Sequence, residues 1–296
     1  MAKSLSLANR LALGTVQFGM SYGIANQKGQ VSRLAAKEIL ELARKREIDT
    51  LDTAIAYGES EICLGEIGTQ DYKLITKLPA IPDDCTYVND WIKEQLQASL
   101  ARLSVSKVYA LMLHRPNQLL GPDGEAIYLA LQSLKNSGVV EKVGISVYAP
   151  NELQLITDKY SIDIVQAPFN LIDRRLKNSG WLEKLKDLGV EIHTRSAFLQ
   201  GLLVMPKETI PAKFSQWTNL FQIWHNWLVS NNFSAVQASL AFPLSFPEID
   251  RVVVGVDSVG QLKQIIEATT KSINLEFPDM QSNEENLINP ANWSNL

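Results

Sequence analysis

The sequence predicts an α/β protein folded as a closed (β/α)8 barrel. Short apolar or β-branched runs alternate along the chain with longer stretches of helical spacing, and eight such runs are present. Alternating strands and helices form βαβ units and therefore a parallel sheet, and eight units in about 250 residues fit one closed barrel. The expected strands are residues 11–15, 49–54, 73–78, 108–114, 141–147, 163–169, 190–196 and 251–256.

An open, doubly wound sheet is the alternative architecture. It would place a glycine-rich phosphate-binding turn directly after the first strand, leading into a helix. Gly14, Gly19 and Gly23 do not have the spacing of that turn, and no helix is expected directly behind them. We therefore prefer the barrel.

Helical stretches fill the gaps between the strand runs, with apolar residues that recur every three or four positions. In the N-terminal half, Ser32 is placed to cap a helix after the first strand. The apolar positions are Ala35, Ile39 and Leu42 in this helix, Val88, Ile92, Leu96, Leu100 and Leu103 before residues 108–114, and Ile127, Leu131 and Leu134 before residues 141–147.

The C-terminal half continues the same alternation. Gly138 and Gly189 stand where a glycine commonly ends a helix, and Pro150 suits a first helical turn. Ser258 is placed to cap the last barrel helix. The apolar positions of these helices are Leu153 and Ile156, then Leu182, Leu185 and Leu188, and finally Leu262, Ile265 and Ile266.

Two segments fall outside the repeat. Residues 198–250 are too long for one connection, so we expect a loop and extra helices at about 216–231 and 234–245. The polar tail either frays or folds across the barrel mouth, with Ile288 and Trp293 as its anchors. The expected organisation is a single domain over residues 1–296, with the barrel over about 10–275 and the C-terminal tail over 276–296.

Composition narrows the classes of partner. The chain has 28 Lys and Arg against 32 Asp and Glu, and its densest basic run, residues 44–46, is short, which argues against nucleic acid. The longest uncharged segment, 214–247, is interrupted by Asn, Gln, Ser and Pro, so no membrane span is expected. Cys63 and Cys85 form neither a metal pattern nor a disulfide framework. With no signal-peptide pattern in the first ten residues, these features predict a cytoplasmic protein without a metal.

Four ionisable side chains fall at or just beyond predicted strand ends, where the active sites of such barrels lie. They are Asp52, Tyr57, Lys77 and His114. Taken singly, each has an ordinary structural explanation as a capping residue, a solvated lysine or a core histidine. Together they could make a phenol acidic, because a nearby ammonium lowers a tyrosine pKa from about 10. The carboxylate would hold the lysine, and the histidine would bond a substrate oxygen.

These positions resemble the motifs of the aldo-keto reductase family. Leu51-Asp52-Thr53-Ala54 with Tyr57-Gly58 and Leu64-Gly65 is similar to the family's Asp and Tyr signature. Its Lys and His motifs are matched by Thr76-Lys77 and Leu113-His114-Arg115-Pro116. The resemblance runs in family order from about residue 10 to 270, through residues 144–146, 165–166, 170, 201–203 and 255–262.

This resemblance, which is to bacterial-type members, implies hydride transfer between a nicotinamide cofactor and a carbonyl compound on a TIM barrel. Tyr57 would donate the proton, Lys77 would tune Tyr57, Asp52 would pair with Lys77, and His114 would orient the carbonyl. Ser146 and Gln166 would hold the carboxamide. The full set implied to bind the cofactor is Gly14, Thr15, Ser146, Gln166, Arg195, Ser196, Leu199, Gly201, Gly255, Val256, Asp257, Ser258 and Gln261.

Some positions depart from the commoner family pattern. Val147 stands where many members have Asn, and Arg195 stands near the place of an aromatic that stacks on the nicotinamide. The segment 255–262 contains no Lys or Arg, although the 2′-phosphate of NADPH usually meets such groups. The family pattern still favours NADP (NADPH), with NAD as the alternative and modest selectivity between them.

The expected partner is a small-molecule carbonyl substrate, and the sequence does not predict an oligomeric state. A cofactor-binding sensor or regulatory protein with little turnover is the alternative on the same fold. An unrelated barrel lyase or isomerase with a Lys77 Schiff base is a third hypothesis. It leaves Asp52, Tyr57 and the segment 255–262 unexplained.

Overall fold

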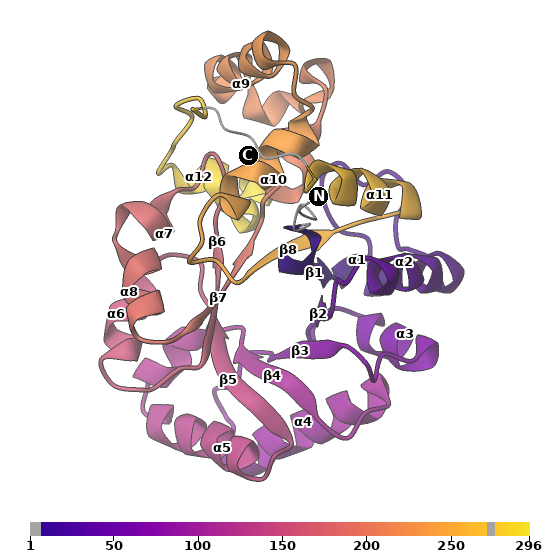
Figure 1. Ribbon diagram of the computed structural model, residues 1–296. Coiled ribbons are helices and arrows are strands. Elements are labelled where there is room, and N and C mark those ends of the chain that lie inside the picture. Colours follow the sequence, from indigo (N-terminus) through magenta and orange to yellow (C-terminus); the bar gives the residue numbers. More distant parts are fainter. Residues whose placement is uncertain (1–6, 271–275) are drawn as a thin grey trace, which may run out of the picture.

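A closed barrel of eight parallel strands forms the centre of the computed structural model, which describes residues 7–270 and 276–296. Each strand pairs with its sequence neighbours, and β1 closes the ring against β8 (Figure 1). The (β/α)8 fold and all eight strand runs are therefore confirmed. The strands are β1 (Leu11–Gly14), β2 (Thr50–Asp52), β3 (Lys73–Leu78), β4 (Val108–Leu113), β5 (Val140–Ser146), β6 (Ile164–Pro168), β7 (Glu191–Arg195) and β8 (Arg251–Gly255).

Helices surround this barrel, and serine caps begin two of them as predicted. Ser32 accepts a hydrogen bond from the backbone N–H of Ala35, and Ser258 accepts one from Gln261. Each cap satisfies a backbone donor that the first helical turn leaves free. The surrounding helices are α2 (Arg33–Lys45), α3 (Ser60–Ile67), α4 (Val88–Leu103), α5 (Gly124–Asn136), α6 (Asn151–Thr157), α7 (Arg175–Asn178), α8 (Trp181–Asp187) and α11 (Val259–Ala268).

One predicted apolar helix position is wrong. Leu188 lies just beyond α8 and is 56% exposed, whereas Leu182 and Leu185 are buried. The chain leaves the helix here because Gly189 adopts a positive φ of 73°, a conformation that glycine takes without steric cost. The prediction from apolar spacing therefore placed one residue too many on the buried face of this helix.

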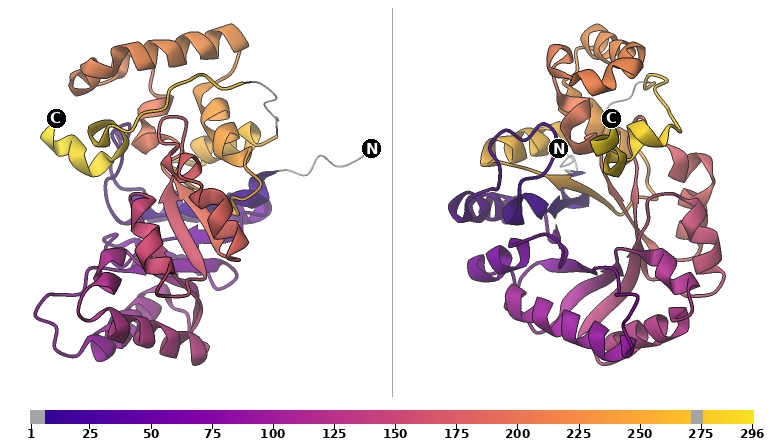
Figure 2. Two further views of the ribbon diagram at one scale, coloured as in Figure 1. Left: turned by 90° about the vertical axis from the view of Figure 1, so that its left-hand side faces the viewer. Right: turned by 180° about the vertical axis from the view of Figure 1, so that it is seen from behind.

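The segment between β7 and β8 holds the extra helices that its length predicted. They are α9 (Thr218–Asn231) and α10 (Ala235–Leu244). Helix α9, in orange, lies outside the ring of barrel helices (Figures 1 and 2). Trp227 of α9 stacks on Trp224 of the same helix, on Phe233 just after it and on Phe277 of the C-terminal tail, and the last of these contacts joins α9 to the tail.

The C-terminal tail folds back and packs beside the C-terminal end of the barrel. Ser282 N–H donates to Ile172 O at 2.9 Å, in the loop that follows β6. Trp293 and Ile288 are buried, as expected of anchors, and Trp293 meets the ring of Phe214 edge-on. The predicted end of the barrel at about residue 275 lies outside the described residues.

The remaining elements are short. None of the helices in the described part of the chain is long and apolar enough to cross a membrane. The short elements are η1 (Leu7–Arg10), α1 (Val16–Gly19), η2 (Pro116–Leu120), η3 (Leu199–Val204), η4 (Lys207–Thr209), η5 (Ala212–Trp217), α12 (Glu285–Ile288) and η6 (Pro290–Asn295).

Candidate active site

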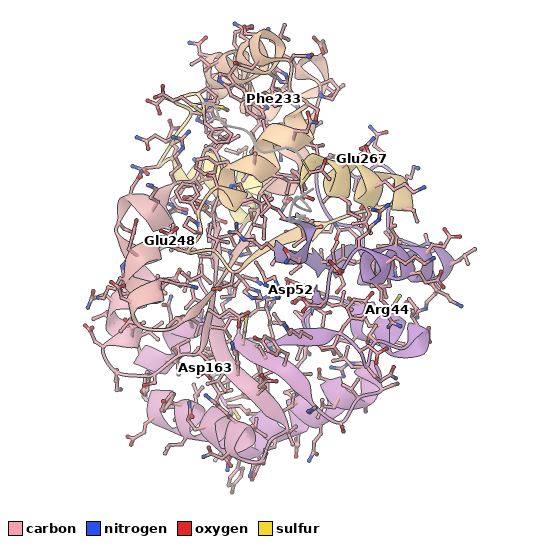
Figure 3. All side chains as sticks on the ribbon, in the orientation of Figure 1. Arg44, Asp52, Asp163, Phe233, Glu248 and Glu267 are labelled. Carbon is pink, nitrogen blue, oxygen red and sulfur yellow. The ribbon has the colours of Figure 1, made fainter. Side chains whose placement is uncertain are left out.

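A cavity of about 340 Å³ opens at the C-terminal ends of the strands. It reaches from Asp52 and Tyr57 to Asp257 and Gln261, beyond the end of β8. Figure 3 shows Asp52 near the centre of the barrel. Of the residues predicted to act in catalysis or to bind a cofactor, those that line the cavity are Gly14, Thr15, Asp52, Tyr57, Gln166, Arg195, Ser196, Gly201, Gly255, Asp257 and Gln261.

A buried ion pair lies at the base of this cavity. Lys77 Nζ donates to both carboxylate oxygens of Asp52, at 2.7 and 2.6 Å, and to the backbone oxygen of Thr53 at 2.9 Å. Lys77 is fully buried, and Asp52 is 4% exposed. Burial lowers the pKa of Lys77, and the Asp52 carboxylate opposes this shift. The pair arises because β2 and β3 are neighbours, so their C-terminal ends meet at the same edge.

Tyr57 lies on the loop between β2 and α3, next to this pair. Lys77 Nζ is 5.3 Å from the centroid of the Tyr57 ring. The centroids of the Tyr57 and His114 rings are 5.7 Å apart, and His114 directly follows β4. Gly19 fixes the loop by close approach, since a Cβ there would stand 1.8 Å from the Tyr57 carbonyl oxygen. The backbone of α1 thus holds the tyrosine loop against the barrel.

The pKa of Tyr57 shifts in the direction opposite to the one expected from a neighbouring ammonium. Burial raises the pKa of Tyr57, and the Asp52 carboxylate raises it further. The expectation of a more acidic Tyr57 is wrong for this structure, because burial dominates the pKa of its phenol and Asp52 partly offsets the Lys77 charge. Tyr57 is therefore a neutral phenol across the physiological range, in the protonated form that a proton donor needs.

His114 is also uncharged at neutral pH. Burial and the nearby Lys77 ammonium lower the pKa of its imidazole to about 3. Its backbone N–H donates to Leu78 O at 3.1 Å, which fixes the start of the loop after β4. A neutral imidazole still carries one N–H and can donate a hydrogen bond to a carbonyl oxygen.

Gln166 and Ser146 lie at the ends of β6 and β5. Gln166 Nε2 donates to Asp52 Oδ2 at 2.8 Å, so its amide already supports the ion pair. Gln166 lines the cavity, whereas Ser146 does not, although it is paired with Gln166 in register. The neighbouring Val147 is fully buried.

The loop after β7 has an unusual backbone. Ser196, Leu199 and Gln200 adopt positive φ values of 65°, 46° and 52°, which non-glycine residues seldom do. Ser196 and Gly201 line the cavity, whereas the Leu199 side chain is fully buried and does not. Leu199 could therefore meet a cofactor only through its backbone.

The loop after β8 forms the far end of the cavity. Gln261 Oε1 accepts from Asp257 N–H at 2.6 Å, and Ser258 Oγ accepts from Gln261 N–H at 3.3 Å. Asn26 Nδ2 donates to Asp257 Oδ1 at 3.3 Å. Gly255, Asp257 and Gln261 line the cavity, whereas Val256 and Ser258 do not.

Sequence reasoning missed several residues that line the cavity. Gln17 Oε1 is buried there without a hydrogen-bond partner in the described part of the chain, a state that usually signals an unseen ligand or water. Gln17 lies in the four-residue helix α1, which is too short to show a periodic signal in the sequence. The other unassigned residues that line the cavity include Tyr22, Asn26, Phe198, Gln200 and Gln264.

A carboxylate, a lysine, a tyrosine and a histidine thus gather at the mouth of a (β/α)8 barrel, the arrangement of a barrel oxidoreductase. A model of the Aldo/keto reductase family matches residues 10–284. The chain belongs to the Aldo/keto reductase family, as its motifs predict, and that family consists of oxidoreductases that act on small carbonyl compounds.

Known proteins agree with this assignment. The chain is 26% identical over 279 residues to the uncharacterized oxidoreductase YqkF of Bacillus subtilis, covering 86% of this chain and 89% of that protein. It is 28% identical over 191 residues to D-arabinose 1-dehydrogenase of Saccharomyces cerevisiae, covering 58% of this chain and 57% of that protein. The holo form of the aldo-keto reductase AKR11C1 from Bacillus halodurans shares the fold, with a TM-score of 0.73 and 21% identity over 92% of this chain and 89% of that one.

Proposed function

We propose that this protein reduces an aldehyde or ketone to an alcohol by hydride transfer, with Tyr57 as the proton donor. The observation that carries the proposal is the buried Asp52–Lys77 pair beside His114 and beside Tyr57, where Asp52 and Tyr57 line the cavity. Four side chains from three neighbouring strand ends converge there, which a purely structural role for each would not require.

The residues of the cavity fit a nicotinamide dinucleotide. The lining of the cavity carries amide and guanidinium donors, and the unpaired Gln17 Oε1 adds a hydrogen-bond acceptor. Such a lining suits a polar ligand that spans from the barrel centre to β8. When bound, the cofactor would supply the hydride.

The chain itself supplies the proton and the orientation. The Tyr57 hydroxyl gives its proton to the carbonyl oxygen as that oxygen gains charge. The neutral His114 imidazole donates a hydrogen bond to the same oxygen, which holds the carbonyl in line. Lys77, held by Asp52, stabilises the negative charge that develops on Tyr57 when its proton leaves.

NADPH is the cofactor that we propose, with NADH as the alternative. Asp257 places a carboxylate at the cavity end that the family pattern gives to the adenosine, and this disfavours a 2′-phosphate. The nearby Lys28 acts in the other direction, as its effect on the Asp257 pKa indicates. We therefore propose that the preference for NADPH is small. A cytoplasmic location and a single domain over the chain remain predictions.

A panel of aldoses, short aldehydes, quinones and keto sugars, assayed with NADPH and NADH in parallel, tests the proposed function. Turnover of a carbonyl compound with either cofactor supports it. Quenching of NADPH fluorescence without turnover would instead favour a cofactor-binding sensor. No fluorescence change with either cofactor would contradict both.

A further inference from the structure

Two arginines at the C-terminal end of the barrel, Arg195 in the lining of the cavity and Arg115 exposed and outside that lining, have no carboxylate partner in the described part of the chain. Arg115 directly follows His114, and Arg195 ends β7 and lines the cavity. Across residues 7–270 and 276–296, neither guanidinium lies within ion-pair distance of an Asp or Glu. Arg115 is exposed and Arg195 is partly buried, so both guanidinium groups are accessible to a ligand.

The two guanidinium groups gather around one aromatic ring. Arg195 lies 4.9 Å and Arg115 lies 5.8 Å from the centroid of Tyr148. Arg195 also donates to Val147 O at 3.1 Å and to Ser196 Oγ at 3.3 Å, which leaves part of its five N–H donors unused. Stacking on Tyr148 orients both planar groups without consuming their donors.

The acidic group beside Tyr148 is Glu152, whose Oε1 accepts from the backbone N–H groups of Tyr148 and Ala149 and pairs with neither arginine. Lys77 is neutralised by Asp52, and His114 is uncharged, in part because Arg195 and Arg115 also lower its pKa. A third arginine nearby behaves differently: Arg175 donates to the Tyr148 carbonyl, but Asp173 and Glu285 both pair with it. The contrast singles out Arg115 and Arg195 as the available cations.

We propose that the natural substrate is an anionic carbonyl compound, whose carboxylate or phosphate group is bound by Arg115 and Arg195 while its carbonyl oxygen meets Tyr57 and His114. Guanidinium forks bind both kinds of anion through paired hydrogen bonds. This inference rests on the proposed function and adds the substrate class to it.

The position of Arg115 separates the substrate from the cofactor. It follows β4, which lies four strands round the closed ring from β8 and hence on the opposite side of the barrel. A dinucleotide that extends from Tyr57 toward Asp257 runs away from Arg115. Arg195 lies nearer to that path, so Arg115 is the more selective residue to test.

The test uses matched pairs of aldehydes that differ in charge. Glyceraldehyde is compared with glyceraldehyde 3-phosphate, and butyraldehyde with succinic semialdehyde, with the full chain and saturating cofactor. We expect kcat/KM to be at least about tenfold higher for the charged member of one or both pairs, and the ratio to fall as potassium chloride is added. The two pairs distinguish a phosphate from a carboxylate as the preferred group.

Variants then assign the effect to the arginine. Arg115→Gln should lower the charged-to-neutral ratio of kcat/KM about tenfold, and Arg115→Lys should restore part of it. Arg44→Gln is the matched control, because Arg44 also lies over an aromatic ring, that of Tyr72 at 5.2 Å. It sits on α2 on the outer side of the barrel (Figure 3), and its replacement should leave the ratio unchanged.

Each alternative outcome is decisive. If the wild-type protein reduces neutral and charged members equally, the inference is wrong and the proposed function stands. If Arg115→Gln weakens the Kd of NADPH, measured by fluorescence titration, as much as it lowers the ratio, the arginine serves the cofactor and the inference is again wrong. If no aldehyde is reduced with either cofactor, the proposed function is wrong, and the inference about the substrate, which rests on it, is wrong as well.

Discussion

The two ends of the barrel treat charge in opposite ways. At the N-terminal ends of the strands, Glu191 accepts hydrogen bonds from Tyr109, Lys142 and His193, and Asp49 pairs with Lys73 and Arg251. At the C-terminal ends, one buried pair stands beside a neutral tyrosine, a neutral histidine and two arginines without a carboxylate partner.

The difference separates stability from chemistry within one fold. The charged groups at the N-terminal end pair mainly with one another, although His193 Nδ1 has no partner in the described part of the chain, whereas the C-terminal end gathers three non-glycine residues at positive φ in the single loop after β7. Such strain costs stability, and barrels place it at the end where their loops bind substrates. Matched substitutions at the two ends can therefore test whether charge serves stability at one end and chemistry at the other.

The largest expected effect comes from removing one hydroxyl at each end. Tyr57→Phe should lower kcat for carbonyl reduction by about 10²–10⁴-fold, because the proton donor is lost, with the Kd of NADPH nearly unchanged.

Tyr109→Phe removes a hydroxyl that donates to Glu191 at 2.6 Å. It should cost about 1–2 kcal/mol of stability and spare kcat. Steady-state kinetics and urea unfolding measure both. Wild-type turnover by Tyr57→Phe would remove the assignment of the proton donor.

The next effect compares two lysines. Lys77→Met leaves the Asp52 carboxylate buried without its partner, which should cost about 3–5 kcal/mol of unfolding free energy and abolish turnover. Lys142→Met is the counterpart at the N-terminal end, where the side chain is 30% exposed and Glu191 keeps two other donors. Its cost should be about 1 kcal/mol or less. Equal costs in urea unfolding would show that Asp52 does not depend on Lys77.

A third effect is the response of the N-terminal end to acid. Burial alone would raise the pKa of Glu191, but hydrogen bonds from His193, Lys142 and Tyr109 overcome it and lower the pKa. A depressed pKa adds stability above the usual carboxyl pKa of about 4.3, and that stability is lost as the pH falls below it.

Glu191→Gln tests this dependence. The variant should be less stable than the wild type at pH 7, and the gap in unfolding free energy should narrow as the pH falls from about 5 toward 3. Glu183→Gln, on the outer helix α8, is the control and should show no such convergence. A gap that stays constant with pH would mean that the Glu191 charge contributes nothing.

Much of this comparison was accessible from the sequence, because it depends on strand ends. Asp52 and Lys77 close neighbouring strands, and His114 directly follows the next, so a barrel brings them together. The hydrogen bond from Gln166 to Asp52 runs from β6 to β2. It could not be predicted from the sequence, because residue spacing does not show which side chains meet across the barrel. The direction of the Tyr57 pKa shift was missed because burial is a property of all the surrounding residues at once. Leu199 was assigned to the cofactor by position, yet tertiary packing buries its side chain.

The smallest effect concerns Asp257, a carboxylate in the cavity lining that forms no ion pair in the described part of the chain. Asp257 lines the cavity near β8 and accepts a hydrogen bond from Asn26. Burial raises the pKa of Asp257, and the Gln261 hydrogen bond and the Lys28 charge oppose this shift. The Ser258 hydroxyl and the Gln261 amide are already used within the loop. The sequence alone suggested that they would bind a 2′-phosphate and favour NADPH by about 1–2 kcal/mol; their present bonds predict less.

Asp257 and Lys28 should therefore set the ratio of the NADH to NADPH dissociation constants, which fluorescence titration measures. Asp257→Ser removes a charge that repels the 2′-phosphate and should shift the ratio toward NADPH by about tenfold, or about 1.4 kcal/mol. Gln261→Arg should shift it the same way, and Lys28→Gln should shift it toward NADH. Asp187→Ser, at the end of α8, is the charge-matched control. If none of the three substitutions changes the ratio of dissociation constants, these residues do not contact the 2′-phosphate. Asp257 would then have no part in the choice of cofactor.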